Sequence, residues 1–247
     1  MRLIILGGEK QSGKDTSANF IAGTILALAK KIESYKINKG GKLVANGALI
    51  NSDEELNAIA PGLVYKTVFA YSLKDFCADH FNIPRNLVYG SDQDKATLTD
   101  IEWDNFPGCC TNLRLFQKIS KISKNAPLFY HPPGKMSIRE ILQYFGTEVV
   151  RKMYSPAWVE ATYQRLLRSN AHFGIVSDCR FPNELELASK FDKSLSVYLA
   201  RPNDGDSHAS ERSLNPLLCD HIIDNTGKRT ALYQKLLDCL KNSKILE

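Results

Sequence analysis

Arg2-Leu-Ile-Ile-Leu-Gly7 runs directly into Gly8-Glu-Lys-Gln-Ser-Gly13-Lys14-Asp-Thr16, and this stretch decides the fold. An apolar run that stops at a glycine is typical of a strand buried on both faces of a parallel sheet. From residue 14 to residue 33, apolar side chains recur at helical spacing, which predicts a helix. A strand, a glycine-rich loop and a helix in this order form the first half of a βαβ unit.

The loop between Gly8 and Lys14 matches the G-x4-G-K pattern of a phosphate-binding loop. Glycines allow backbone N–H groups to turn inward around an anion, and the helix that follows adds the positive end of its dipole. Lys14 would bring its ammonium to the β- and γ-phosphates of a nucleotide. The pattern normally continues with Ser or Thr, but here Asp15 follows, and then Thr16. The alternative is a glycine turn without a ligand, and the flanking strand and helix favour phosphate binding.

Strands and helices alternate along the rest of the chain. We expect strands near 64–70, 172–177, 194–200 and 220–224, and helices near 72–81, 137–153, 155–168, 182–191 and 230–241. This alternation predicts an α/β fold in which a central parallel sheet carries helices on both faces. We expect a single domain over residues 1–247, with an insertion over about 36–135 and a polar segment over about 203–213.

The composition excludes several classes of protein. Of the 247 residues, 43% are hydrophobic and 24% are charged, so the chain is not disordered, collagen-like or a coiled coil. The net charge of +5 suits an anionic small molecule but is low for a protein that coats nucleic acid. The N-terminal apolar run is too short for a signal peptide or a membrane span. The six cysteines include no CxxC pair, which favours a reducing, cytoplasmic compartment.

A second group of polar residues follows the predicted strand at 172–176. Asp178 stands where this strand ends, and the carboxyl ends of parallel strands face the ligand crevice of an α/β sheet. A carboxylate there suits a water-mediated contact with Mg²⁺ or a hydrogen bond to a substrate. The alternative is a helix cap before Pro182. Because Arg180 and Glu184 follow so closely, we favour a functional role.

Five motifs occur in order along the chain: Ser12-Gly-Lys-Asp-Thr16, Phe69-Ala-Tyr-Ser-Leu-Lys-Asp75, Arg139 with Gly146-Thr-Glu148, Asp178-Cys-Arg-Phe-Pro-Asn-Glu184, and Arg201-Pro202. Together they resemble the bacteriophage deoxynucleoside monophosphate kinases, and no motif covers the segments 36–63 and 96–135. The resemblance implies a three-layer P-loop nucleoside monophosphate kinase fold with a substrate-binding insertion and a lid. It also implies Mg²⁺-dependent transfer of the γ-phosphoryl group of ATP to deoxynucleoside 5′-monophosphates, which supplies DNA precursors for phage replication in the host cytoplasm.

The resemblance further implies roles for individual residues. The residues expected to bind ATP are Gly8, Ser12, Gly13, Lys14, Asp15, Thr16, Asn225 and Gly227. The residues expected to bind the acceptor are Lys10, Lys74, Lys95, Arg139, Gly146, Thr147, Trp158, Asp178 and Glu184. The positive charge for the transfer would come from Lys10, Lys14, Arg139 and Arg180. Mg²⁺ would be held through water by Asp15 and Asp178, and a lid over about 203–213 would contribute His208 and Ser210.

Several of these residues also have a purely structural interpretation. Lys74 could be a solvated charge on a helix, and Trp158 could belong to the core. Asn225-Thr-Gly227 is also an ordinary turn sequence. The segment with His208 and Ser210 could be an exposed loop that ends in a helix cap.

Other functions stay open at the level of sequence. Phosphomevalonate kinase is also similar, in its Ser-Gly-Lys-Asp loop and in Ser207-His-Ala-Ser-Glu211. A regulatory module that binds nucleotide without turnover is a second alternative, although it would not need Lys74, Arg139 and the 178–180 group. A kinase of nucleic-acid ends would need a basic groove lined with aromatic residues, and no such run is present. The expected partners are therefore nucleotides and not polymeric nucleic acid or a membrane, and a homodimer is left open.

Overall fold

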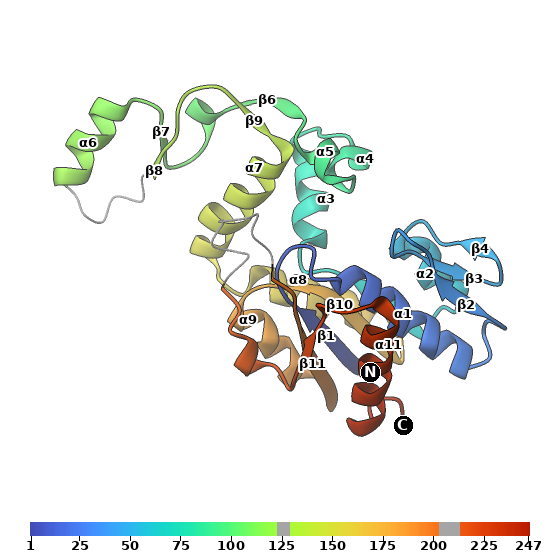
Figure 1. The fold of residues 1–247 in the computed structure, drawn as a ribbon. Helices are drawn as coiled ribbons and strands as arrows, with labels where there is room; N and C mark the ends of the chain where they lie inside the picture. Colours follow the sequence, from blue (N-terminus) through green and yellow to red (C-terminus); the bar gives the residue numbers. More distant parts are fainter. Residues whose placement is uncertain (123–128, 203–212) are drawn as a thin grey trace. The chain divides into compact units, whose positions relative to one another are not determined.

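The computed structural model describes residues 1–122, 129–202 and 213–247 (Figure 1). The chain divides into two compact units. The first, called the phosphate-loop unit, comprises Met1–Tyr71 and Trp158–Glu247, and the second, called the middle unit, comprises Ser72–Ala157. Within the described ranges, every helix is too short or too polar to cross a membrane.

The phosphate-loop unit contains two sheets and the helices that surround them. Its strands are β1 (Arg2–Gly7), β2 (Tyr35–Ile37), β3 (Leu43–Ala45), β4 (Ala48–Leu49), β5 (Val64–Thr67), β10 (Phe173–Cys179), β11 (Lys193–Ala200) and β12 (His221–Asp224). Its helices are α1 (Lys14–Leu28), α2 (Asp53–Ile59), α8 (Ala157–Ser169), α9 (Pro182–Leu185) and α11 (Arg229–Asn242), with 3₁₀ turns at Glu186–Lys190 and Pro216–Leu218.

Five strands form one parallel sheet in the order β12-β11-β1-β10-β5. The apolar residues 3–6 of the middle strand β1 are completely buried, because neighbouring strands and helices cover both of its faces. At its carboxyl end, Gly7 pairs with Cys179 of β10 and with Tyr198 of β11. The predicted α/β fold with a central parallel sheet is therefore confirmed, and the glycine-rich loop leaves the sheet from its middle strand.

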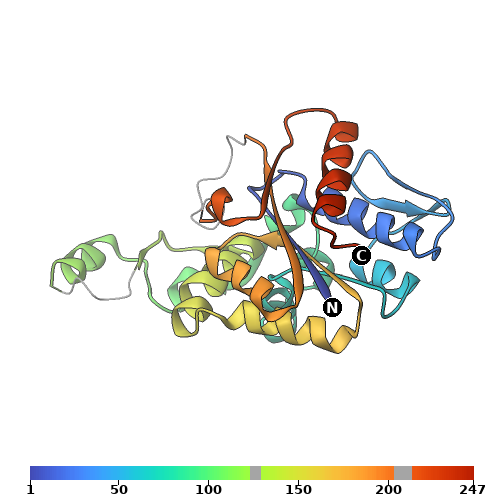
Figure 2. The ribbon, with the colours of Figure 1, turned by 90° about the horizontal axis from the view of Figure 1, so that it is seen from below.

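Helices cover both faces of this sheet (Figure 2). On one face, Ile21 of α1 and Leu236 of α11 join the strand residues in the main core. On the other face, α8 packs on β10, where a Cβ on Gly174 would come within 2.8 Å of the Leu166 side chain. Figure 2 shows α8 on the opposite side of the strands from α1 and α11.

The small sheet β2–β3–β4 is antiparallel and lies along α1 (Figure 1). Tyr35 of β2 packs over Gly23 of α1, where a Cβ would meet its ring at 2.5 Å. The hydroxyl groups of Tyr35 and Thr24 share a hydrogen bond of 2.7 Å. Leu43 belongs to the main core. The first part of the expected insertion is thus an integral layer of the phosphate-loop unit.

The middle unit consists of short elements around an aromatic cluster. Trp103 is 1% exposed, stacks on His131 at a ring distance of 3.7 Å and meets the edge of Tyr144 at 4.9 Å. Its helices are α3 (Tyr71–His80), α4 (Arg85–Val88), α5 (Asp92–Lys95), α6 (Leu113–Ile122), α7 (Ile138–Tyr144) and a π-helix at Phe145–Arg151, with a 3₁₀ turn at Trp103–Asn105. Its strands are β6 (Leu98–Glu102), β7 (Cys109–Cys110), β8 (Phe129–Tyr130) and β9 (Lys135–Ser137).

Three predicted helices have different bounds or windings from those expected. The first ends at Leu28 and not at 33, because Lys30 adopts a left-handed conformation with φ 55°. The predicted helix over 137–153 starts with a capping box at Ser137, but from residue 145 it winds as a π-helix. The predicted helix over 182–191 is α-helical only to Leu185 and continues as 3₁₀. The spacing of apolar residues predicts a helix correctly in these segments, but it does not distinguish α-helix from π-helix or 3₁₀ helix.

Candidate active site

The loop after β1 closes around the ammonium of Lys14. Its Nζ donates hydrogen bonds to the carbonyl oxygens of Gly8 at 2.7 Å and Glu9 at 2.6 Å, and the residue is 8% exposed. A buried ammonium needs such oxygen partners because removal from water disfavours its charge. The loop therefore concentrates a full positive charge at the N-terminal end of α1, where the helix dipole also favours an anion.

Two glycines of this loop have no space for a side chain. Gly8 has φ 143°, and a Cβ there would lie 2.7 Å from the carbonyl oxygen of Leu199. Gly13 precedes α1 with φ 96°, and a Cβ there would lie 2.7 Å from Nδ2 of Asn225. Both conformations belong to the region that favours glycine. The glycine spacing of the motif thus has a steric cause in this chain.

Asn225 supports the loop from the neighbouring end of β12. It is 7% exposed, and its Nδ2 donates a hydrogen bond of 2.8 Å to the carbonyl oxygen of Ser12. Asn225 is among the residues expected to bind ATP, and its support of the loop was not predicted. No sequence signal could have indicated it, because the two residues are far apart in the chain and the acceptor is a backbone atom.

Asp178 lies at the end of β10 and accepts two backbone hydrogen bonds. Its Oδ1 accepts from the N–H of Phe69 at 2.6 Å, and its Oδ2 accepts from the N–H of Ala70 at 3.1 Å. Asp178 therefore anchors the segment that follows β5. The motif around Phe69 and the motif around Asp178 are far apart in the sequence, and only the fold brings them into contact.

Ser177, next to Asp178 in β10, contacts the first turn of α1. Its buried hydroxyl donates a hydrogen bond of 2.8 Å to Oδ1 of Asp15, which is otherwise exposed. Asp15, the unusual residue after the loop lysine, is thereby held beside the carboxyl end of β10.

The described residues contain no group of three or more His, Cys, Asp or Glu side chains able to hold a metal ion by themselves. Mg²⁺ in nucleotide sites is usually bound through one or two carboxylates together with phosphates and waters. Asp15, whose carboxylate accepts a hydrogen bond from Ser177, supplies an oxygen that fits an ion arriving with a nucleotide.

Glu184 shapes the loop that carries Arg180. The Glu184 carboxylate is 2% exposed, and its Oε2 accepts hydrogen bonds from the N–H groups of Arg180 at 2.7 Å and Phe181 at 3.1 Å. Both of these hydrogen bonds come from backbone N–H groups and hold the start of α9. Between Asp178 and Arg180, burial raises the pKa of the Cys179 thiol well above its usual value, so this cysteine stays protonated at neutral pH.

Three of the predicted basic residues lie in the middle unit, and each contacts a different partner there. Arg139 of α7 donates from Nη2 to Oδ1 of Asp92 at 2.6 Å. Lys95, on the same short helix as Asp92, donates to the carbonyl oxygen of Gly90. Lys74 of α3 has its Nζ 5.1 Å from the ring centre of Tyr89.

Packing accounts for two further predicted site residues. A Cβ on Gly146 would lie 2.6 Å from the Leu73 side chain, so this glycine lets the π-helix approach α3 closely. Thr147, beside it, is half-buried. Trp158, in the phosphate-loop unit, is 8% exposed, as the core interpretation requires.

The remaining predicted site residues lie elsewhere. Lys10 is half-buried in the glycine-rich loop, and Gly227 is exposed after β12. His208 and Ser210 lie outside the described residues.

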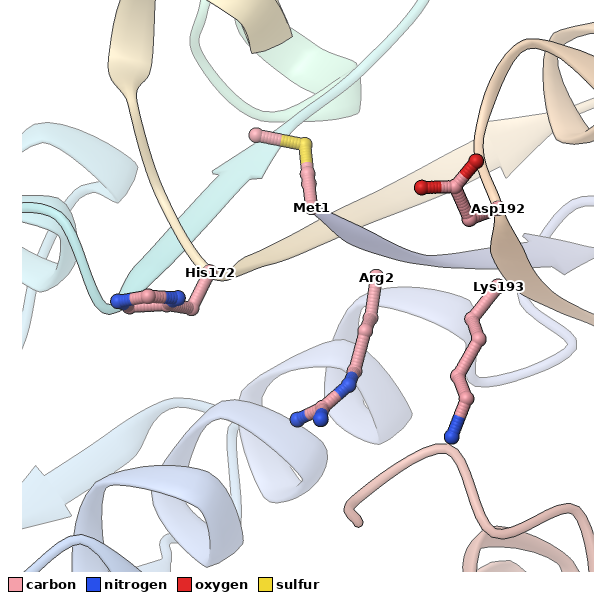
Figure 3. A pocket seen from close by; sticks show the side chains of 5 residues that line it. All are labelled: Met1, Arg2, His172, Asp192 and Lys193. Atoms are coloured by element: carbon pink, nitrogen blue, oxygen red, sulfur yellow. The ribbon is translucent and has the colours of Figure 1, made fainter.

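A cavity of about 360 Å³ in the phosphate-loop unit has a different lining (Figure 3). Its lining residues stand at or just before the amino ends of β1, β10 and β11, whereas the phosphate loop follows a carboxyl end. They are Met1, Arg2, His172, Asp192 and Lys193. This cavity includes none of the predicted site residues.

Comparison with known proteins agrees with this geometry. The profile of the family described as deoxynucleotide monophosphate kinase matches residues 88–236, which is more than half of the chain. The chain is also similar to the deoxynucleotide monophosphate kinase of Enterobacteria phage T4: they are 25% identical over 262 residues, covering 98% of this chain and 99% of that relative. The parallel sheet, with its glycine-rich loop after the middle strand, and a family match over more than half of its length place this chain among the deoxynucleotide monophosphate kinases, to which it belongs.

Proposed function

We propose that this chain transfers the γ-phosphoryl group of ATP to deoxynucleoside 5′-monophosphates and so supplies DNA precursors for phage replication in the host cytoplasm. The observation that supports it most is the loop closed around Lys14. An oxygen of the acceptor phosphate forms a bond to the γ-phosphorus, while the bond between that phosphorus and the bridging oxygen of the departing ADP breaks. No general base is required, because the acceptor is already an anion.

The donor phosphates would be held by Gly8 and by residues 12–16. Lys14 would neutralise charge on the β- and γ-phosphates, and Lys10 and Arg180 would add charge near the transferring group. Glu184 supports this role of Arg180, because it holds the Arg180 backbone in place. Asn225 keeps the loop in shape, and Gly227 would lie toward the base.

We propose Mg²⁺ as the cofactor, held through water by Asp15 and Asp178. When bound, the ion neutralises negative charge on the donor phosphates. Asp15 can serve in place of the usual hydroxyl because Mg²⁺ prefers oxygen ligands and retains several waters.

Asp15→Asn is expected to raise the Mg²⁺ concentration for half-maximal rate about tenfold, because one negative charge near the ion is lost. The measurement is the initial rate against Mg²⁺ concentration at fixed ATP. Asp238→Asn, which removes an exposed carboxylate from α11, is the matched control and should leave the curve unchanged. An unaltered Mg²⁺ dependence in both Asp15→Asn and Asp178→Asn would refute the assignment.

The acceptor phosphate would be bound by Arg139, with Lys74, Lys95 and Thr147 as further contacts in the middle unit. The planar guanidinium of an arginine suits a phosphate because it can donate two parallel hydrogen bonds. The side chain of Arg139 is 29% exposed and that of its partner Asp92 is 57% exposed. Because ion pairs that solvent can reach are weak, Arg139 can exchange Asp92 for a phosphate at a small cost in free energy.

Arg139→Lys and Arg180→Lys should give different kinetics. Arg139→Lys is expected to raise KM for the monophosphate about tenfold with little change in KM for ATP, because ground-state binding is lost. Arg180→Lys is expected to lower kcat about tenfold or more, because charge stabilisation in the transition state is lost. If Arg139→Lys weakens ATP and spares the monophosphate, the residue belongs to the donor side.

The proposed activity is tested by ADP release with a panel of ribo- and deoxyribonucleoside monophosphates, with phosphomevalonate as a further acceptor. We expect ADP only with nucleotide acceptors, and with deoxynucleotides preferred. Turnover of phosphomevalonate alone would favour the other small-molecule kinase. Binding of ATP without any acceptor-dependent turnover would favour a regulatory module.

A further inference from the structure

The turn between β2 and β3, residues 38–42, is fixed by side chains from two helices. Arg229, the first residue of α11, donates from Nη1 to the carbonyl oxygen of Asn38 at 2.8 Å and from Nη2 to that of Lys39 at 2.7 Å. Asn19 of α1 donates from Nδ2 to the carbonyl oxygen of Gly41 at 2.9 Å. These three hydrogen bonds to backbone oxygens hold the hairpin turn in one position.

The hairpin turn rests on the first turn of α1. Gly41 is buried with φ 81°, and a Cβ there would clash with Oγ1 of Thr16. Thr16 is the third residue of α1, two positions after Lys14. A helix that begins at a phosphate loop directs its first backbone N–H groups at the ligand. The contact with Gly41 therefore lies beside the residues that would hold the donor phosphates.

Arg229 also connects the hairpin turn to the segment that supports the loop. It lies four residues after Asn225, whose side chain binds the carbonyl oxygen of Ser12. The loop, the start of α1, the end of β12 and the hairpin turn are thus joined by hydrogen bonds and close contacts within the phosphate-loop unit.

We propose that the hairpin turn is a wall of the donor-nucleotide site, which sets the position of Thr16 against the phosphate chain of a nucleoside triphosphate. The proposal rests on the proposed function, since it assumes that ATP occupies the loop. Gly41 allows the close approach, and Arg229 and Asn19 hold the turn in place. The hairpin turn is then a positioning element for the donor and has no part in acceptor binding.

Two glycines in neighbouring turns of the same small sheet provide a matched test. Gly41 has φ 81°, and Gly47, in the turn between β3 and β4, has φ 84° with nothing within 4 Å of an added Cβ. Alanine therefore introduces the same backbone strain at both positions, but only Gly41→Ala pushes against Thr16. We expect Gly41→Ala to raise the Kd for ADP and the KM for ATP about tenfold, with KM for the monophosphate unchanged. Gly47→Ala should leave all three constants at wild-type values.

The Arg229 variants test the same proposal without strain in the turn. Arg229→Gln replaces the two-pronged guanidinium and is expected to weaken ADP binding severalfold. Arg229→Lys, which keeps a charged donor group on a single nitrogen, should give an intermediate value. Lys241→Gln, in the last turn of α11, is the control for loss of a charge. Gly41→Ala changes no charge. If the Gly41 and Arg229 variants both weaken ADP binding, the effect of Arg229 is therefore not purely electrostatic.

The outcomes separate this inference from the proposed function. The measurements are ADP binding by titration calorimetry, steady-state kinetics, and circular dichroism to confirm folding. If the wild type does not bind ADP, the proposed function itself fails. If the wild type binds ADP and folded Gly41→Ala and Arg229→Gln bind it equally well, only the wall is refuted. A rise in KM for the monophosphate alone also overturns the proposal.

Discussion

Lys14→Ala is expected to lower kcat about 10³-fold, which corresponds to about 4 kcal/mol of transition-state stabilisation. The reason is the position of the ammonium, held by the carbonyl oxygens of Gly8 and Glu9 inside the loop. In a water-excluded loop, this charge interacts with phosphate oxygens much more strongly than it would in solvent. The measurement is acceptor-dependent ADP release at saturating substrates.

The control for Lys14→Ala is Lys31→Ala, which removes an exposed ammonium just beyond the other end of the same helix. This variant should keep wild-type turnover. Both variants should retain the circular dichroism spectrum of the wild type, because neither side chain belongs to the hydrophobic core. Wild-type turnover in folded Lys14→Ala would remove the phosphate-loop assignment.

Gly8→Ala is the second change with a large expected effect. A Cβ at this position would meet the Leu199 carbonyl oxygen at 2.7 Å and the Ser12 hydroxyl at 2.6 Å, so the loop must move. A displacement of about 1 Å in a positioning element can lower turnover about 10²-fold. Overpacking should also reduce the free energy of unfolding by about 1–3 kcal/mol, beyond the cost of the backbone conformation. Kinetics and the melting temperature measure the two effects.

Gly134 offers a matched control for the backbone conformation. Its φ of 140° is close to the 143° of Gly8, but an added Cβ at Gly134 has nothing within 4 Å. Gly134→Ala should therefore carry only the conformational cost of about 1–3 kcal/mol and keep the loop intact. Equal losses of turnover in the two variants would show that the steric argument for Gly8 is wrong.

The parts of the fold that local sequence encodes were predicted well. The residues of β1 are buried on both faces, and this is the reason that they form an uninterrupted apolar run. Ser137 and Glu140 are three residues apart, so their capping box can be recognised from sequence. The strands β6 to β9 were not predicted, because strands of two to five residues are too short to produce a periodic pattern.

By itself, the sequence determined the first strand, the glycine-rich loop and the helix that follows it, the α/β class, and the ordered motifs that identify the family. These features are encoded by residues that are close together in the sequence, and the side-chain types of those residues indicate a buried strand, a turn or a charged site. Only the tertiary structure decided that Asn225 holds the loop, that Asp178 anchors the segment after β5, and that Arg229 fixes the hairpin turn. In each case a side chain bonds to backbone atoms far away in sequence, and backbone atoms are the same in every residue, so the partner leaves no mark on the sequence.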